Sequence, residues 1–101
     1  MNKYAHIKAS DLKEMNTNLQ KYLDIVILEL DEIDAAIEYC DNSLAFWERT
    51  NRIPEEERFR KIYDLTRVKR QVESRKRIFD ELFEALGDAF RAIDDFVDYI
   101  E

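Results

Sequence analysis

The sequence predicts an all-α protein, a long antiparallel helical hairpin, and three observations carry that prediction. Only one Gly and one Pro occur among the 101 residues, whereas sandwiches, barrels and doubly wound sheets need turn residues every ~8–12 positions. Charged residues make up 39% of the chain and hydrophobic residues 46%, which is typical of amphipathic helices and not of disorder. Apolar residues recur at steps of three and four on either side of one break at Pro54.

Residues 11–50 are predicted to form the first helix, after a lead-in of residues 1–9. Asp11 with Glu14 three positions later reads as a loose capping box, and Ser10 is the competing N-cap. Two successive steps of four residues meet at Val26, which predicts a stutter that locally unwinds a left-handed supercoil. The apolar seam predicted for this helix is Leu12, Met15, Leu19, Tyr22, Val26, Leu30, Ile33, Ile37, Cys40, Leu44 and Trp47.

The turn is predicted at residues 51–53 and the second helix at residues 54–100. Pro54 suits the first turn of a helix, where its missing N–H is not needed. The seam keeps its phase across Gly87, which favours one continuous helix with at most a kink there. The alternative is a helix end at Gly87 and a short third helix from Asp88. The predicted seam is Ile62, Leu65, Lys69, Val72, Lys76, Phe79, Phe83, Leu86, Phe90, Ile93, Val97 and Ile100.

The apolar stripe of the second helix widens from Leu82 onward. A wide apolar face needs more than one neighbouring helix. We therefore expect self-association into a helical bundle, as a homo-oligomer such as a dimer; the alternative is that residues 1–9 pack onto that end. The predicted oligomer interface is Leu82, Phe83, Leu86, Phe90, Ile93, Val97 and Ile100.

Charge is segregated along the chain. Residues 1–50 carry 10 acidic and 5 basic side chains, residues 51–79 carry 5 and 10, and residues 80–101 carry 8 and 1. An antiparallel hairpin sets the basic stretch of the second helix beside the most acidic part of the first, and this pairing fixes the register. Lys69 and Lys76 stand on the seam itself and are expected to specify that register.

The acidic residues of the C-terminal segment are the predicted partner-binding site. Glu81, Asp88 and Asp95 recur every seven residues and therefore lie in one line on a helix. Such a stripe can imitate a phosphate backbone or meet a basic groove of another protein; the competing interpretation is a solubilising surface. The predicted site is Asp80, Glu81, Glu84, Asp88, Asp94, Asp95, Asp98 and Glu101.

The sequence offers little for catalysis, so no catalytic residue, cofactor or metal site is expected. His6 is the only histidine and lies in the lead-in, which excludes histidine-based triads and HExxH zinc sites. One glycine excludes glycine-rich phosphate loops. Cys40 has no partner for an internal disulfide and is expected to be a small buried hydrophobic residue.

Other features point to protein partners. No apolar run approaches the ~18 residues of a membrane span, and a cytoplasmic protein without membrane contact is expected. The basic run from Arg67 to Arg77 spreads around its helix within a chain of net charge −7, so no direct binding of nucleic acid is expected. Aromatic residues near the turn either close the hairpin tip or anchor a partner; they are Phe46, Trp47 and Phe59.

These observations favour a non-catalytic acidic binding protein. The expected role is a small inhibitor of the anti-defence type that phages and mobile elements use, comparable to anti-CRISPR proteins, acting in the host cytoplasm. Its partner would be a nuclease or another nucleic-acid-binding protein with a basic surface, whose substrate channel the carboxylates occupy.

The alternative is a structural or secretion-type hairpin, or an adaptor, that acts through helix–helix association. The chain is similar in architecture to the secreted Trp-x-Gly helical hairpins, which form four-helix dimers. Trp47 lies near the turn, followed by Glu48 and Arg49 and not by a Trp-x-Gly motif, and Tyr99 is followed by Ile100 and Glu101 without an acid four positions on. The resemblance covers the layout of the chain.

Overall fold

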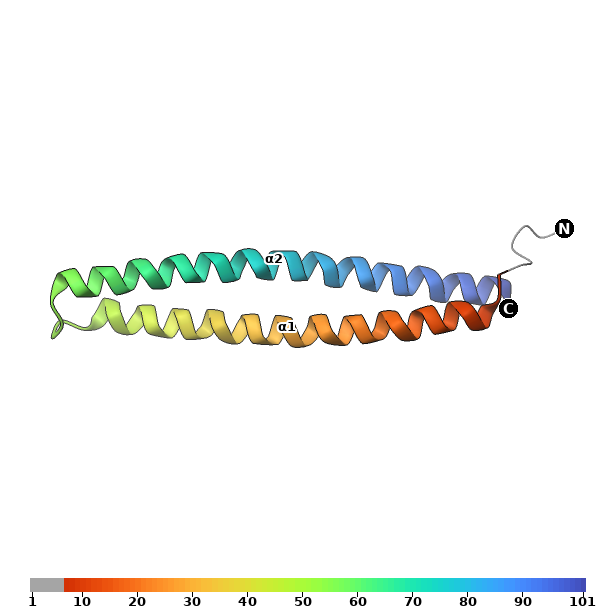
Figure 1. The fold of residues 1–101 in the computed structure, drawn as a ribbon, viewed down its shortest axis with the longest axis horizontal. Coiled ribbons are helices and arrows are strands. Elements are labelled where there is room, and N and C mark those ends of the chain that lie inside the picture. The colour runs from red at the N-terminus through yellow and green to blue at the C-terminus, as the bar shows by residue number, and fades with distance from the viewer. Residues whose placement is uncertain (1–6) are drawn as a thin grey trace. The chain divides into compact units, whose positions relative to one another are not determined.

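A computed structural model describes residues 7–101 and shows two helices joined by one short connection (Figure 1). Helix α1 spans Ala9–Arg49, 41 residues, and α2 spans Glu55–Ile100, 46 residues. No strand occurs within residues 7–101, so the predicted all-α hairpin is confirmed. His6 and the first six positions of the predicted lead-in lie outside the described residues.

Helix α1 begins two residues earlier than the sequence predicts. The carbonyl of Lys8 accepts hydrogen bonds from the backbone N–H groups of Asp11 at 3.1 Å and Leu12 at 3.3 Å. Ser10 and Asp11 therefore lie inside the first turn, and neither is the N-cap. Asp11 still favours the helix, because its carboxylate lies near the positive end of the helix dipole.

The connection between the helices is held by backbone and side-chain hydrogen bonds. The N–H of Thr50 donates to the carbonyl of Phe46 at 3.0 Å and closes the end of α1. The carbonyl of Pro54 accepts the N–H of Arg58 at 3.0 Å and opens α2. Arg58 Nη1 donates to the carbonyl of Thr50 at 3.0 Å across the connection. Arg58 thereby satisfies one of the free carbonyls that a helix leaves at its C-terminus.

Helix α2 continues through Gly87, and no third helix occurs within residues 7–101. Gly87 has no positive φ, and a Cβ built on it would meet only Arg91 Nη1, at 3.9 Å. The regular phase of the seam across Gly87 therefore predicted the helix correctly, and the alternative of a C-cap at this glycine is wrong.

The chain divides into two compact units, each with a segment of α1 packed against an antiparallel segment of α2. Unit 1 comprises Met1–Leu28 and Asp80–Glu101, and unit 2 comprises Glu29–Phe79. Among residues 7–101, the buried side chains of unit 1 are Asn16, Leu23, Val26 and Val97. Those of unit 2 are Ile33 and Cys40.

The seam of α1 differs from the predicted one in its first part. Met15 and Tyr22, placed on the seam by the sequence analysis, are 51% and 58% exposed, whereas Asn16 and Leu23 are buried. The predicted stutter at Val26 is therefore wrong, because the covered residues alternate steps of four and three throughout. They are Leu12, Asn16, Leu19, Leu23, Val26, Leu30, Ile33, Ile37, Cys40, Leu44 and Trp47.

The seam of α2 is close to the predicted one. Every predicted position is buried or half-buried except Phe83, which is 41% exposed. Val97 is the most deeply buried of them. The steps of three and four along α2 are unbroken, although Lys69 and Lys76 occupy two of the positions. This regular spacing predicted the covered side of the helix correctly.

Candidate functional site

The eight acidic residues predicted as a site lie on one side of α2 in unit 1 and form what we call the acidic face. Helix geometry places them in three adjacent lines, in which successive acids are seven or fourteen residues apart. All eight side chains are exposed. The first line holds Glu81, Asp88 and Asp95, the second Asp80, Asp94 and Glu101, and the third Glu84 and Asp98.

Two of these carboxylates have cationic partners. Glu101 forms an ion pair with Lys13 of α1, and Asp88 forms one with Arg91 one turn along α2. The hydrogen bond with Glu101 and the charge of that carboxylate raise the pKa of Lys13, with a smaller contribution from Asp98. Within residues 7–101 the other six carboxylates form no hydrogen bond or ion pair.

The surplus negative charge of the chain belongs to unit 1. By sequence this unit carries 11 acidic and 5 basic side chains, whereas unit 2 carries 12 and 11. Carboxylates that lack a partner keep their strength as acceptors for Arg and Lys donors of another molecule. The acidic face can therefore attract and align a cationic surface.

Unit 2 uses part of its positive charge internally. Lys69 Nζ lies 2.5 Å from an oxygen of Asp41, and Lys76 Nζ lies 2.9 Å from an oxygen of Asp34. Arg75 Nη2 reaches Glu29 at 3.5 Å. These three pairs confirm that the basic stretch of α2 lies beside acidic residues of α1, as the sequence predicts.

Lys69 shows how a cation is accommodated on the seam. Its stem is half-buried and its ammonium reaches the flanking Asp41, which lies beside the seam on α1. The hydrogen bond with Asp41 raises the pKa of Lys69, while desolvation works in the opposite direction. A half-buried ammonium is stable only where an acidic side chain of the other helix lies beside it. The pair of Lys69 with Asp41 therefore favours the register of the two helices that brings these residues together.

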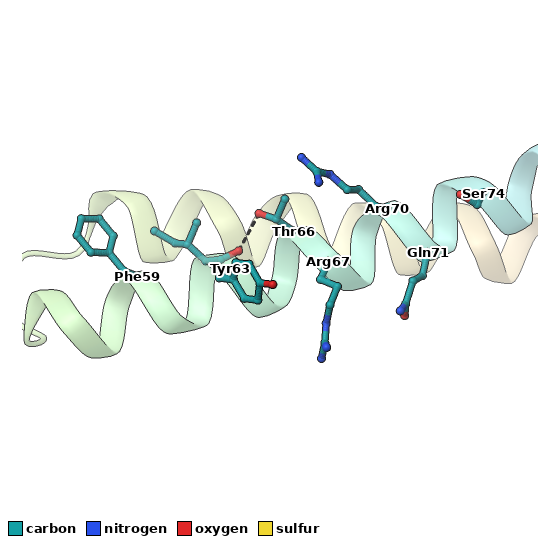
Figure 2. A pocket seen from close by; sticks show the side chains of 8 residues that line it. Phe59, Tyr63, Thr66, Arg67, Arg70, Gln71 and Ser74 are labelled. Atoms are coloured by element: carbon teal, nitrogen blue, oxygen red, sulfur yellow. Dashed lines mark hydrogen bonds between the residues drawn. The ribbon is translucent and has the colours of Figure 1, made fainter.

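A second charged surface in unit 2 was missed by the sequence analysis. Exposed arginines on the side of α2 away from these pairs form no ion pair with α1 within residues 7–101. A groove of about 570 Å³ runs among them. Figure 2 shows Arg70 directed to one side of it, and Arg67 and Gln71 to the other. The lining residues are Phe59, Ile62, Tyr63, Thr66, Arg67, Arg70, Gln71 and Ser74.

The signal for this groove was present in the sequence. Phe59 and Tyr63 are one turn apart and share a helix face, which continues into Arg67 and Arg70. The basic residues of α2 do spread around its circumference, but internal pairing removes Lys69, Arg75 and Lys76 from the free set. Of the basic run from Arg67 to Arg77, the remaining Arg67, Arg70 and Arg77 lie on one side of α2.

The structure separates the three predicted aromatic anchors. Phe46 and Trp47 meet edge to face, with ring centroids 5.4 Å apart at 84°. Trp47 is half-buried at the end of the α1 seam, whereas Phe46 is exposed. Phe59 is exposed on α2, and the guanidinium of Arg58 lies 5.6 Å from its ring centroid. Trp47 thus packs inside unit 2, and Phe46 and Phe59 present their rings to the surface.

Most of the predicted oligomer interface is covered within unit 1. Val97 is buried there, and the half-buried members are Leu86, Phe90, Ile93 and Ile100. Only Leu82 and Phe83 remain largely exposed, at 42% and 41%. The side chains available to a second molecule are therefore largely different from the predicted set.

Neither metal ligands nor a membrane-crossing helix are found among the described residues. No three of the His, Cys, Asp and Glu side chains in residues 7–101 are grouped to hold a metal ion. No helix in the same part of the chain has a stretch apolar enough to cross a bilayer. Cys40 is a free, buried cysteine, as expected.

Comparison with known proteins gives no relative from which a role could be transferred. No protein-family model matches the sequence, and no curated protein or solved structure is significantly similar to it.

Proposed function

We propose that this chain is a non-catalytic inhibitor whose acidic face occupies a basic nucleic-acid-binding surface of a partner protein. One observation carries the proposal: six carboxylates on one side of α2 in unit 1 form no hydrogen bond or ion pair within residues 7–101. A surface that only keeps the chain in solution can mix acidic and basic side chains and does not need acids alone. Here a single cation, Arg91, interrupts the acidic face.

The mode of action follows from helix geometry. Acids that recur every seven residues lie about 10 Å apart along a helix. The line of Glu81, Asp88 and Asp95 has this spacing, and the two neighbouring lines add acids seven or fourteen residues apart. Together they present a two-dimensional array of negative charge to lysines and arginines that otherwise bind phosphates. Occupation of that surface displaces nucleic acid by competition and makes binding salt-dependent. Proteins that phages and mobile elements direct against host defence nucleases in the cytoplasm are the class in which such an inhibitor would act.

The test is affinity capture from a bacterial lysate with the tagged protein at low and at high salt. The decisive variant replaces four acids of the acidic face together: Asp88→Asn, Asp94→Asn, Asp95→Asn and Asp98→Asn. We expect the original chain to recover a nucleic-acid-binding protein at low salt only, and the variant to recover none. Circular dichroism should show unchanged helicity.

A matched control carries the same change in net charge at exposed acids of α1 in unit 2. It combines Asp31→Asn, Glu32→Gln, Glu38→Gln and Glu48→Gln, all exposed positions without an ion pair within residues 7–101. The control should recover the partner as the original chain does. Equal recovery by the acidic-face variant would refute the proposal, and equal loss in both would assign binding to net charge alone.

The second candidate is a structural or adaptor role through helix–helix association. The observation that favours it is the number of large apolar side chains that unit 1 leaves exposed, among them Met15, Tyr22 and Tyr99. Such a role predicts an oligomer or complex that does not dissociate at high salt.

A further inference from the structure

Helix α2 carries a second apolar seam in unit 1. Residues on its outer side follow one another at alternating steps of three and four, the same period as the seam that contacts α1. All are exposed except the half-buried Phe96, and Tyr99 is 71% exposed. The rings of Phe96 and Tyr99 stack with centroids 6.2 Å apart. The second seam is Leu82, Ala85, Ala89, Ala92, Phe96 and Tyr99.

Helix α1 adds apolar residues to the same side of unit 1. Lys13 directly follows the seam residue Leu12, and Glu101 directly follows the seam residue Ile100. Their ion pair shows that residues which follow the seam on α1 and on α2 lie on the same side of the helix pair. Met15 and Tyr22 directly precede seam positions, as do the second-seam residues Leu82, Ala89 and Phe96. In an antiparallel pair, residues that precede the seam on both helices share the side opposite to those that follow it.

We propose that these residues form a docking face for a second copy of this chain, so that two units 1 pair into a four-helix bundle. The second apolar face comprises Met15, Tyr22, Ile25, Leu82, Ala85, Ala89, Ala92, Phe96 and Tyr99. The proposal goes beyond the inhibitory function and does not depend on it, because none of these residues belongs to the acidic face, which adjoins this face only at its rim.

The exposed area favours a second copy as the occupant. The five large side chains of this face that are exposed, Met15, Tyr22, Ile25, Leu82 and Tyr99, have exposed fractions of 42–71%. Their full burial together with the rest of the face would remove on the order of 800 Å² from each molecule, the area that each partner of a specific dimer buries. A monomeric protein rarely exposes so large an apolar patch. One polar residue, Asn18, lies between Met15 and Tyr22 on α1. The face has no charged residue in it, and the three alanines at its centre let two helix backbones approach closely.

Self-pairing is also compatible with the charges at the rim. In a bundle whose twofold axis runs parallel to the helices, α1 of one copy lies antiparallel to α2 of the other. Lys21 then comes level with Asp88 of the second copy, and Glu14 comes level with Asp95. The attraction between Lys21 and Asp88 and the repulsion between Glu14 and Asp95 offset each other. Burial of apolar area therefore has to drive the association, which should withstand high salt.

The test is sedimentation equilibrium of the full chain over a wide concentration range, at low and at high salt. We expect twice the 12.2 kDa mass of the chain at micromolar concentration and at both salt levels. Ala89→Glu and, separately, Tyr22→Glu should give monomers with unchanged helicity. Both positions are exposed in the single chain, so these changes spare the contact with α1. Phe90 is unsuitable, because it packs within unit 1.

The matched control is Ala35→Glu, at an exposed position of α1 in unit 2, which should remain dimeric. A monomeric original chain would overturn the proposal, as would a dimer that both Glu variants leave intact. A dimer that dissolves in high salt would also overturn it and would point to pairing between charged surfaces. The four-Asn variant of the acidic face should still dimerise, and Ala89→Glu should still capture its partner, so the two proposals fail separately.

Discussion

Asn16 Nδ2 donates a hydrogen bond to the backbone carbonyl of Phe90 at 3.1 Å and so links α1 to α2 inside unit 1. Asn16 is only 7% exposed. Its Oδ1 is buried and accepts no hydrogen bond from residues 7–101. A buried acceptor without a donor costs about 1–3 kcal/mol, which is comparable to or more than a single interhelical hydrogen bond contributes. A polar residue at such a position can still specify the register of the helices.

Asn16→Leu should raise the free energy of unfolding by about 1 kcal/mol, because it removes the unsatisfied oxygen and fills the same space with apolar atoms. Chemical denaturation of both proteins measures the difference. Asn16→Ala is the control and should lower stability, since it leaves a cavity. A loss of stability in the Leu variant would show that the bond to Phe90 outweighs the buried oxygen.

Gly87→Ala should stabilise the chain by about 0.8 kcal/mol, the difference in helix propensity between the two residues. Gly87 lies inside α2, and the added Cβ would meet only Arg91 Nη1 at ordinary contact distance. Thermal unfolding followed by circular dichroism measures the effect. Ala35→Gly at an exposed position of α1 should lower stability by a similar amount. A destabilised Gly87→Ala variant would indicate that the glycine is needed for a close approach.

The ion pair of Lys69 with Asp41 should give stability a dependence on alkaline pH. The pKa of Lys69 is raised above its ordinary value of 10.5 by the hydrogen bond with Asp41. The folded state therefore holds this proton more tightly than the unfolded state does. The contribution is fully present below 10.5 and is lost as the pH rises through the raised pKa.

Asp41→Asn should accordingly lower the melting temperature at neutral pH and have a smaller effect once Lys69 is deprotonated in both proteins. Melting curves of the two proteins across the alkaline range measure this. Asp31→Asn, at an exposed acid without a cationic partner within residues 7–101, is the control. A difference between Asp41→Asn and the original chain that stayed constant to the alkaline limit would assign the effect to helix propensity.

Cys40 should react slowly with a thiol reagent in the native protein. Its side chain is almost completely buried in the seam of unit 2, so labelling requires the helices to separate. We expect a rate at least about tenfold below that of the unfolded chain, because opening is a minor population. Labelling of the native protein at the unfolded rate would contradict the buried position.

The sequence predicted most of the fold because apolar spacing and turn residues act locally. The lone Pro54, the near absence of glycine and the unbroken period of α2 correctly predict two helices and the covered side of the second. Along α1 the apolar spacing predicted Met15 and Tyr22 as seam residues, because Asn16 is polar and an apolar pattern does not include it. The resulting stutter at Val26 follows from that one-residue shift and disappears when Asn16 is included.

The candidate site could be predicted only in part. Acidic side chains usually lie on the exposed side of a helix, because burial of an unpaired charge is costly. Their spacing alone therefore predicts that they lie on one side of α2. The interface residues were harder, because Phe90 and Ala89 are adjacent in sequence and only the packing of α1 decides which of them is covered. The spacing of Phe59, Tyr63, Arg67 and Arg70 places them on one face of α2. Which cations of α2 stay unpaired depends on the ion pairs formed across the helices, and composition does not reveal this.

Because a single connection joins the helices, we expect folding to proceed in a defined order. Contacts in unit 2 close shorter loops than those in unit 1: Arg75 and Glu29 are 46 positions apart, whereas Asn16 and Phe90 are 74 and Lys13 and Glu101 are 88 apart. Each doubling of loop length costs about 0.6 kcal/mol of chain entropy. Pairing should therefore begin beside the connection and reach unit 1 last, and unit 1 should open first. A molecule that binds unit 1 would then slow this opening and protect its backbone amides from hydrogen exchange.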